Sequence, residues 1–367
     1  MTLLLKRKTF SVGCSCCERA PAFAAWGVSR RRLLVAGAAA GLSAAAARIA
    51  VPPARAEPRA TAHRVDVHHH VVPPAQRKAF IERGRRPAKW SPQMSIEDMD
   101  KGGVATAIAS ILNPGVWFGK VEDASRRLAR ECNEYCAQLG RDHRGRFGFF
   151  AAIPLPDTEG SLREIEYALD TLKADGIALW TNYSDKYLGD PAFLPVFEEL
   201  NRRKAVVYTH PTASTCCGIR IKGVADGTIE TATETTRTVA SLIFGEGGTV
   251  HRFKDIRWIW PHSGGTVPFL TSRFEQQTRV KPDARMPNGP LPILRSFFYD
   301  VAQGNTPGQL AALLKMVSIS QVMFGSDYPF REAKEAVDGL VAYRFSKADM
   351  AAIDNGNALK MFPNIKI

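Results

Sequence analysis

The sequence predicts an α/β fold, a (β/α)8 or TIM barrel, and three observations point to it. Eight short apolar runs alternate with longer helical patterns over about 300 residues, as the barrel requires. The runs are rich in Val, Ile, Phe or Ala without strict alternation, which is typical of parallel strands buried on both faces. No Gly-x-Gly-x-x-Gly turn follows the first run, which argues against a dinucleotide-binding sheet, although the pattern leaves a doubly wound open sheet as the alternative.

The strands and helices follow from apolar runs and spacing. The predicted strands are 64–68, 104–112, 147–153, 176–179, 205–209, 256–260, 297–301 and 321–325. The helical patterns between them are 121–139, 161–173, 190–200, 228–244 and 307–316, with Asp190-Pro191 as an N-cap and first-turn proline. The connections 71–95 and 211–227 are polar or rich in Pro and Gly, so we expect loops over the mouth of the barrel.

Residues 1–56 predict a twin-arginine signal peptide, which leaves 57–367 as a single catalytic (β/α)8 domain. Paired arginines in 29–34 precede an Ala/Gly/Leu-rich stretch, and 54–56 reads Ala-Arg-Ala, a cleavage site between small residues. A membrane anchor is the alternative, but Arg48 interrupts the apolar stretch. We therefore expect export by the twin-arginine machinery to the periplasm or outside the cell, without stable membrane association after cleavage.

Charge and cysteines add little about partners. Residues 1–56 carry +8 of the net charge of +13, which leaves a mild +5 for the rest and argues against a nucleic-acid partner. In the predicted domain, Cys132 and Cys136 are four apart and Cys216 and Cys217 are adjacent, neither of which is a zinc spacing. An oxidising compartment would permit a disulfide, but the sequence does not give a pairing.

Histidines and one aspartate stand at four predicted strand ends. His68 and His70 end the first strand two residues apart, so both side chains point to one face and can bind one ion. The further metal-competent side chains at the ends of the fifth, sixth and eighth strands are His210, His262 and Asp327. Strand C-termini converge on one face of a barrel, so all five are expected to share a pocket. His69 should face away from the barrel axis.

These motifs together resemble the amidohydrolase superfamily, in the branch of aminocarboxymuconate-semialdehyde decarboxylase and related non-oxidative aromatic-acid decarboxylases. The resemblance covers nearly all of 64–363, and 115–118 (Gly-Val-Trp-Phe) and 132–134 (Cys-Asn-Glu) are similar to 6-methylsalicylate decarboxylase-like members. It implies a TIM barrel of the metal-dependent hydrolase type and a small carboxylic acid substrate in a homodimer. It also implies that the metal ligands are His68, His70, His210 and Asp327. His262 would be the general acid/base.

One departure from the wider superfamily indicates a single ion. Binuclear members carry a bridging carboxylated Lys on the fourth strand, where this chain reads Gly-Ile-Ala-Leu-Trp at 176–180, and Lys186 comes only later. Three imidazoles and one carboxylate suit Zn²⁺, with Mn²⁺ as second choice. The branch also holds a substrate carboxylate with an Arg that the sequence does not identify.

The resulting hypothesis is a decarboxylase in which His262 or Asp327 gives a proton to the ring carbon that bears the carboxylate. The first alternative is an enzyme that hydrolyses a lactone or an amide. The second alternative is a periplasmic metal-binding protein without enzymatic activity. His262 argues against the second alternative, because metal storage needs no general base. Aromatic side chains that could line the substrate pocket, or equally serve as packing, are Trp90, Trp117, Phe118, Trp180 and Phe330.

Overall fold

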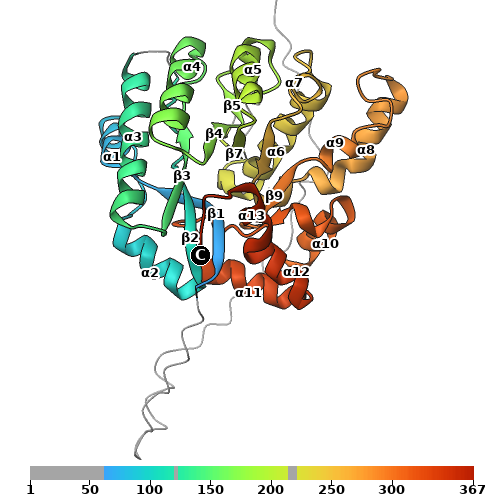
Figure 1. Ribbon diagram of the computed structural model, residues 1–367. Coiled ribbons are helices and arrows are strands. Elements are labelled where there is room, and N and C mark those ends of the chain that lie inside the picture. The colour runs from blue at the N-terminus through green and yellow to red at the C-terminus, as the bar shows by residue number, and fades with distance from the viewer. Residues whose placement is uncertain (1–61, 120–122, 214–220) are drawn as a thin grey trace, which may run out of the picture. The chain divides into compact units, whose positions relative to one another are not determined.

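The computed structural model describes residues 62–119, 123–213 and 221–367. In this part of the chain eight strands form one sheet in which each strand pairs in parallel with the next. The strands are β1 (Arg64–Val71), β2 (Val104–Ile111), β3 (Phe147–Ala152), β4 (Gly176–Trp180), β7 (Val206–His210), β8 (Arg257–Trp260), β9 (Phe298–Asp300) and β10 (Val322–Met323). Helices surround the sheet (Figure 1), so the predicted (β/α)8 barrel is confirmed.

The barrel closes where the chain that continues β10 meets β1. The Val67 amide donates to the Phe324 carbonyl over 3.0 Å, and the His70 amide donates to the Tyr328 carbonyl over 2.7 Å. His69 and Tyr328 also form an isolated parallel bridge. This closure places the Asp327 segment directly beside the strand that carries the first two histidines.

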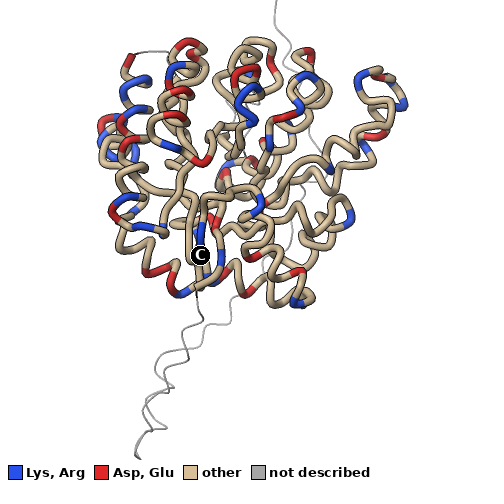
Figure 2. Tube along the Cα trace, in the orientation of Figure 1, with Lys and Arg blue, Asp and Glu red and all other residues tan. Residues whose placement is uncertain are grey.

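The described helices lie outside the sheet. They are α1 (Pro74–Glu82), α2 (Pro92–Gly102), α3 (Asp123–Asp142), α4 (Thr158–Glu166), α5 (Leu194–Arg202), α6 (Asp226–Phe244), α7 (Thr249–Arg252), α8 (Val267–Val280), α9 (Leu291–Leu294), α10 (Pro307–Met316), α11 (Ala333–Tyr343), α12 (Lys347–Ala351) and α13 (Asn357–Met361). Lys and Arg mix with Asp and Glu along the helices of the face in view (Figure 2). Within the described ranges, no helix has the length and apolar character needed to cross a membrane.

The prediction that 71–95 is a loop is wrong. It contains the whole of α1, and α2 begins at Pro92. Proline is accepted in the first helical turn because its missing N–H would have no intrahelical partner there, and Ser91 caps α2 by accepting from the Met94 amide over 3.2 Å. The short antiparallel hairpin of β5 (Asn182–Tyr183) and β6 (Lys186–Tyr187) was also not predicted.

Aromatic side chains fill the barrel below the histidines. The Phe150 and Tyr208 rings stack with centroids 5.0 Å apart and planes within 6°, and both side chains are fully buried. The His68 ring lies 5.4 Å from the Tyr208 ring. The imidazoles therefore stand on a packed apolar layer at the carboxyl-terminal end of the strands, where active sites of this fold lie.

The predicted signal peptide at 1–56 falls outside the described residues and stays a prediction. The described residues all belong to one compact unit, Pro58–Ile367.

Candidate metal centre

The three predicted histidine ligands each have one ring nitrogen engaged. On β1, His68 Nδ1 donates to Asp300 Oδ2 over 2.9 Å, and His70 Nδ1 lies 2.9 Å from Ser110 Oγ on β2. At the end of β7, His210 Nδ1 donates to the Pro211 carbonyl over 3.0 Å. These partners fix the rings so that each Nε2 is turned toward the barrel axis.

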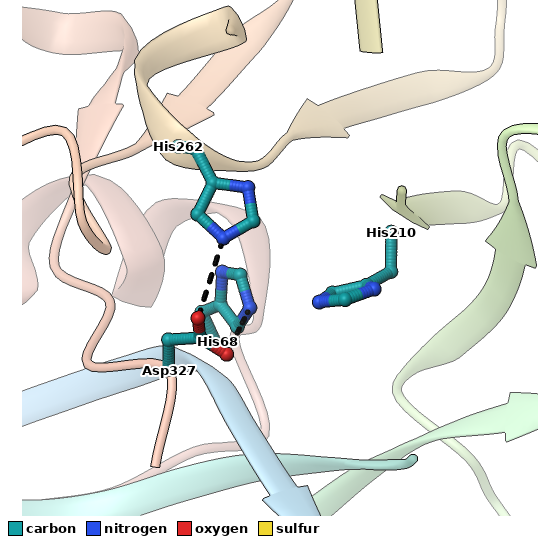
Figure 3. A group of neighbouring side chains, drawn as sticks. All are labelled: His68, His210, His262 and Asp327. Carbon is teal, nitrogen blue, oxygen red and sulfur yellow. Dashed lines mark hydrogen bonds and ion pairs between the residues drawn. The ribbon is translucent and has the colours of Figure 1, made fainter. Parts of the chain in front are cut away.

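Asp327 completes the group from the segment after β10. Its amide donates to the His68 carbonyl over 2.8 Å, and its backbone has a φ of +68°. Its Oδ1 atom lies 3.2 Å from Nε2 of His68 and 3.2 Å from Nε2 of His70. Figure 3 shows this carboxylate between His68 and His262, with His210 pointing toward them from the opposite wall.

Four buried atoms in this cluster have no hydrogen-bond partner among the described residues. They are Nε2 of His68, His70 and His210 and Oδ1 of Asp327. Leaving a buried polar atom without a partner costs about 1–3 kcal/mol, so four at one point call for a shared partner. Three imidazole nitrogens and one carboxylate oxygen are a donor set that divalent transition metals prefer. The residues therefore fit a metal ion.

His262 lies beside these four atoms and differs from them. Nε2 of His262 is 3.4 Å from Asp327 Oδ2, whereas its Nδ1 is the nitrogen without a partner. The ligand-capable atoms of His262, His68, His210 and Asp327 all lie within 4.8 Å of one another. The position is compatible with a fifth ligand or with a proton-transfer group, and the pairing of its Nε2 with the carboxylate favours the second.

The electrostatics of the cluster favour a bound cation. Burial opposes a charge on His68, but the carboxylates of Asp300 and Asp327 outweigh it and raise its pKa to about 10. Burial lowers the pKa of His70, and burial with the neighbouring imidazoles holds the pKa of His210 well below its usual value. The pocket thus holds two buried carboxylates beside two imidazoles, those of His70 and His210, that resist protonation. A bound metal ion balances the negative charge of the carboxylates and accepts the lone pairs of the neutral imidazoles.

A hydrogen-bonded chain supports the centre from behind β1. Trp90 Nε1 donates to Ser95 Oγ over 2.8 Å, and Ser95 Oγ is 2.9 Å from His69 Nε2. Because an indole N–H can only donate, the Ser95 hydroxyl is left to donate to His69, whose Nδ1 then donates to Asp66 Oδ2 over 3.2 Å. Asp66 also accepts from the Ser326 hydroxyl over 2.6 Å, next to Asp327. His69 thus faces away from the axis, as predicted.

The structure brings two of the predicted pocket aromatics to the site. Trp180 pairs with His210 in the β4–β7 register, so both side chains point to the same face. Its ring lies against Gly115, which has a φ of +69° and where a Cβ would fall 2.5 Å from the indole. The Phe330 ring is 5.9 Å from the His70 ring and the residue is 56% exposed, at the mouth of the site.

Trp90 and Phe118 pack away from the cluster, and Trp117 stays a prediction. Trp90 lies in the chain of hydrogen bonds behind β1. Phe118 packs on the end of α1, with its ring centroid 5.9 Å from that of Phe80 and 4.3 Å from the Arg83 guanidinium. Trp117 is half-buried against the core. A sequence shows that an aromatic residue is near a strand end, but not which side of the strand its ring occupies.

The remaining predictions concern lysine and cysteine. Lys186 Nζ lies 3.2 Å from Asp190 Oδ2, so the nearest lysine after β4 is paired outside the metal cluster. Cys132 and Cys136 are free and buried in α3. Cys216 and Cys217 lie outside the described residues.

Sequence reasoning missed Asp300, Ser110 and Gln303. Asp300 and Ser110 hold two of the imidazoles, and the Gln303 side-chain amide donates to Asp327 Oδ2. Asp300 and Ser110 each stand at or next to a strand end, as the ligands do. That position is the signal that could have found them.

Comparison with known proteins agrees with this geometry. The amidohydrolase family model matches residues 65–363. A decarboxylase of Aspergillus niger, yanB, is 36% identical over 331 residues, covering 83% of this chain and 88% of that protein. The 6-methylsalicylic acid decarboxylase of Penicillium expansum is 33% identical over 317 residues, covering 83% and 97%.

A solved structure extends the likeness to the fold. It is a dihydroxybenzoic acid decarboxylase of Polaromonas with bound manganese and the inhibitor 2-nitroresorcinol. It superposes with a TM-score of 0.69 at 20% identity, covering 83% of this chain and 98% of that one. With a family match over nearly the whole described domain, this chain belongs to the amidohydrolase family, in the branch that contains the 6-methylsalicylic acid decarboxylases.

Proposed function

We propose that this protein is a metal-dependent, non-oxidative decarboxylase of a small aromatic carboxylic acid, with 6-methylsalicylate as the first substrate to test. The observation that carries the proposal is the convergence beside His262 of four buried ligand atoms that make no hydrogen bond. The Penicillium and Aspergillus relatives, both named as decarboxylases, favour loss of CO₂ over hydrolysis.

The proposed ligands are Nε2 of His68, His70 and His210 and Oδ1 of Asp327, around one divalent ion. Zinc is our first choice because the set is rich in nitrogen. Manganese is the second, and it is the ion bound in the Polaromonas structure. When bound, the ion supplies positive charge that orients an oxygen-bearing substrate.

His262 is the proposed proton donor to the ring carbon that carries the carboxylate. Asp327 is less suited, because its Oδ1 faces the two Nε2 atoms of β1 and its Oδ2 already accepts from Gln303 and His262. The new C–H bond forms as the proton arrives. The bond to the carboxylate then breaks, its electron pair restores the aromatic ring, and CO₂ leaves.

Surrounding residues hold these groups in place. Asp300 Oδ1 accepts from the His262 amide over 3.0 Å while Oδ2 of the same carboxylate accepts from the His68 ring, so one side chain orients the donor and a ligand. Trp180 and Phe330 supply apolar surface on which an aromatic substrate can pack.

The test is turnover by the purified protein after reconstitution with zinc or manganese. Release of CO₂ from 6-methylsalicylate or another hydroxybenzoate is the expected result, with about one metal ion bound per chain. Turnover of a lactone panel without any CO₂ release would assign the site to hydrolysis instead. Two ions per chain would contradict the single-ion site.

We further propose export through the twin-arginine pathway and a homodimer. The motif at 29–34 supports export, and replacing both Arg30 and Arg31 with Lys should keep the protein in the cytoplasm in a fractionation experiment. Phe269, in α8, is 69% exposed and is the proposed contact with a second copy. Light scattering that gives the mass of one chain would exclude the dimer.

A further inference from the structure

Gln303 is a residue near the metal cluster that neither the ligand set nor the proton transfer uses. It follows β9, is exposed at the carboxyl-terminal end of the barrel, and donates through its side-chain amide to Asp327 Oδ2. A carboxylate oxygen can only accept here, so the NH₂ group of the amide faces Asp327. Oδ1 of the same carboxylate is left for the ion.

The backbone around Gln303 is held in an uncommon conformation. Its φ is +49°, and three other non-glycine residues with positive φ belong to the same strand ends: His262 at +54°, Ser263 at +55° and Asp327 at +68°. Such conformations cost about 1–3 kcal/mol each and persist where the surroundings enforce them, often at functional sites. Here they bring the side chains of Gln303, His262 and Asp327 together.

Contacts on both sides fix this conformation. The Ser263 hydroxyl donates to the Gly304 carbonyl over 2.9 Å, and a Cβ on Gly304 would fall 2.4 Å from the Ser263 hydroxyl oxygen. Gln309, in the first turn of α10, donates to the Gln303 carbonyl over 3.2 Å. The loop after β9 is therefore packed between the His262 turn and α10. These contacts hold the Gln303 side chain where it reaches Asp327.

Two donors compete for Asp327 Oδ2. His262 Nε2 is 3.4 Å away, longer than the length of about 2.7–2.9 Å of a strong charge-assisted hydrogen bond, and the second donor is the Gln303 amide. Without Gln303, the carboxylate would be free to turn toward His262, and Oδ1 would move away from the two Nε2 atoms of β1.

We propose that Gln303 is a positioning residue for the metal centre, which holds the Asp327 carboxylate so that Oδ1 stays directed at the ion. The proposal rests on the metal site proposed above and does not depend on the identity of the substrate. Groups that support a metal ligand typically contribute 10–100-fold to metal affinity, and we expect an effect in this range.

The experiment compares Gln303→Met with Gln303→Glu. Methionine keeps the length of the side chain without a donor, and glutamate replaces the donor with a carboxylate that repels Oδ2. We expect the dissociation constant for Zn²⁺, measured by competition with a chromogenic chelator, to rise about 10–100-fold in Gln303→Met and further in Gln303→Glu. Excess Zn²⁺ should restore most of any activity of Gln303→Met.

The matched control is Gln138→Met, which removes an exposed amide-to-carboxylate hydrogen bond, from Gln138 Nε2 to Asp142 Oδ1 within α3, and touches no ligand. Its Zn²⁺ dissociation constant should stay within about threefold of wild type, since it supports no ligand directly. Wild-type affinity in Gln303→Met, or equal loss in both variants with unchanged melting temperatures, would overturn the proposal. Because the chelator assay contains no substrate, it tests the positioning role of Gln303 even if the decarboxylase assay detects no activity.

Discussion

The polar and charged side chains at the two ends of the barrel differ in whether they have hydrogen-bond partners within the protein. At the amino-terminal end, Asp354 accepts from Arg64 Nε over 2.9 Å and lies 3.0 Å from His63 Nε2, and Arg64 also donates to the Gly102 carbonyl. At the carboxyl-terminal end, three imidazoles and a carboxylate keep one atom each without a partner. At the amino-terminal end the polar groups bind one another and stabilise the fold, whereas at the carboxyl-terminal end they are left available to bind a ligand.

Backbone of positive φ occurs at both ends, since Lys173 and Lys204, just before β4 and β7, have φ values of 58° and 51°. His262, Ser263, Gln303 and Asp327 have positive φ at the carboxyl-terminal strand ends, where the metal cluster lies. The aromatic layer of Phe150 and Tyr208 lies in the barrel below the ligand cluster. Because the cluster lies at the carboxyl-terminal end, substitutions there should change chemistry or metal binding, and substitutions at the other end should change stability.

The largest expected effect is at the carboxyl-terminal end. His262→Asn should lower kcat for decarboxylation by about 10²–10⁴-fold, the usual contribution of a general acid, with bound metal and melting temperature close to wild type. Steady-state kinetics on metal-loaded protein, with metal analysis of the same sample, measures both. Loss of the metal together with activity would make His262 a ligand and not the proton donor.

A change at the amino-terminal end should act on stability alone. Asp354→Ala leaves the partly buried Arg64 guanidinium without its carboxylate, so we expect the free energy of unfolding to fall by about 1–3 kcal/mol. Urea denaturation of the metal-free protein measures it. The exposed pair of Lys334 and Asp338 provides a control, since Asp338→Ala should change stability by less than about 1 kcal/mol. A weaker metal affinity in Asp354→Ala would contradict the separation of the two ends.

A smaller effect is expected where a supporting group holds a ligand. Asp300→Asn loses the charge that accepts from His68 Nδ1 but keeps the size of the side chain. We expect the metal dissociation constant to rise about 10–100-fold, with a small change in stability. Chelator competition and thermal melting of the same preparation give both values. An unchanged dissociation constant would show that Pro211 and Ser110, which hold the other two imidazoles, suffice.

The last expected effect is a pH dependence of stability away from the metal cluster. Asp175 lies just before β4, and burial raises its pKa to about 6, although the Phe149 amide donates to it. The folded state thus holds this proton more tightly than the unfolded chain, so the carboxyl group costs stability as the pH rises from about 4 through 6. Asp175→Asn should raise the stability of the metal-free protein by up to about 3 kcal/mol at pH 7.5 and leave it unchanged near pH 4. An equal gain at both pH values would assign the effect to packing.

Much of the site could be predicted because, in a barrel, residues near the carboxyl ends of different strands lie close together even when they are far apart in the chain. His210 ends a strand, His262 and Asp327 follow one closely, and His68 lies in the last half of β1; parallel strands in a barrel end on one face. The supporting residues were harder to find. Gln303 reaches Asp327 through a backbone turn of positive φ, and nothing in the residue type indicates that conformation.

The sequence by itself predicted the barrel, the convergence of the ligand residues and the outward direction of His69, because the period of each strand and its alternation with helices can be read locally. Only the tertiary structure decided which nitrogen of each imidazole is free, because that depends on partners from other strands, such as Asp300 and Ser110. It also showed that Trp180 and Phe330 lie by the metal cluster while Trp90 and Phe118 do not, since packing against neighbouring elements directs each ring. The predicted metal centre thus acquired its geometry from contacts between residues far apart in the chain.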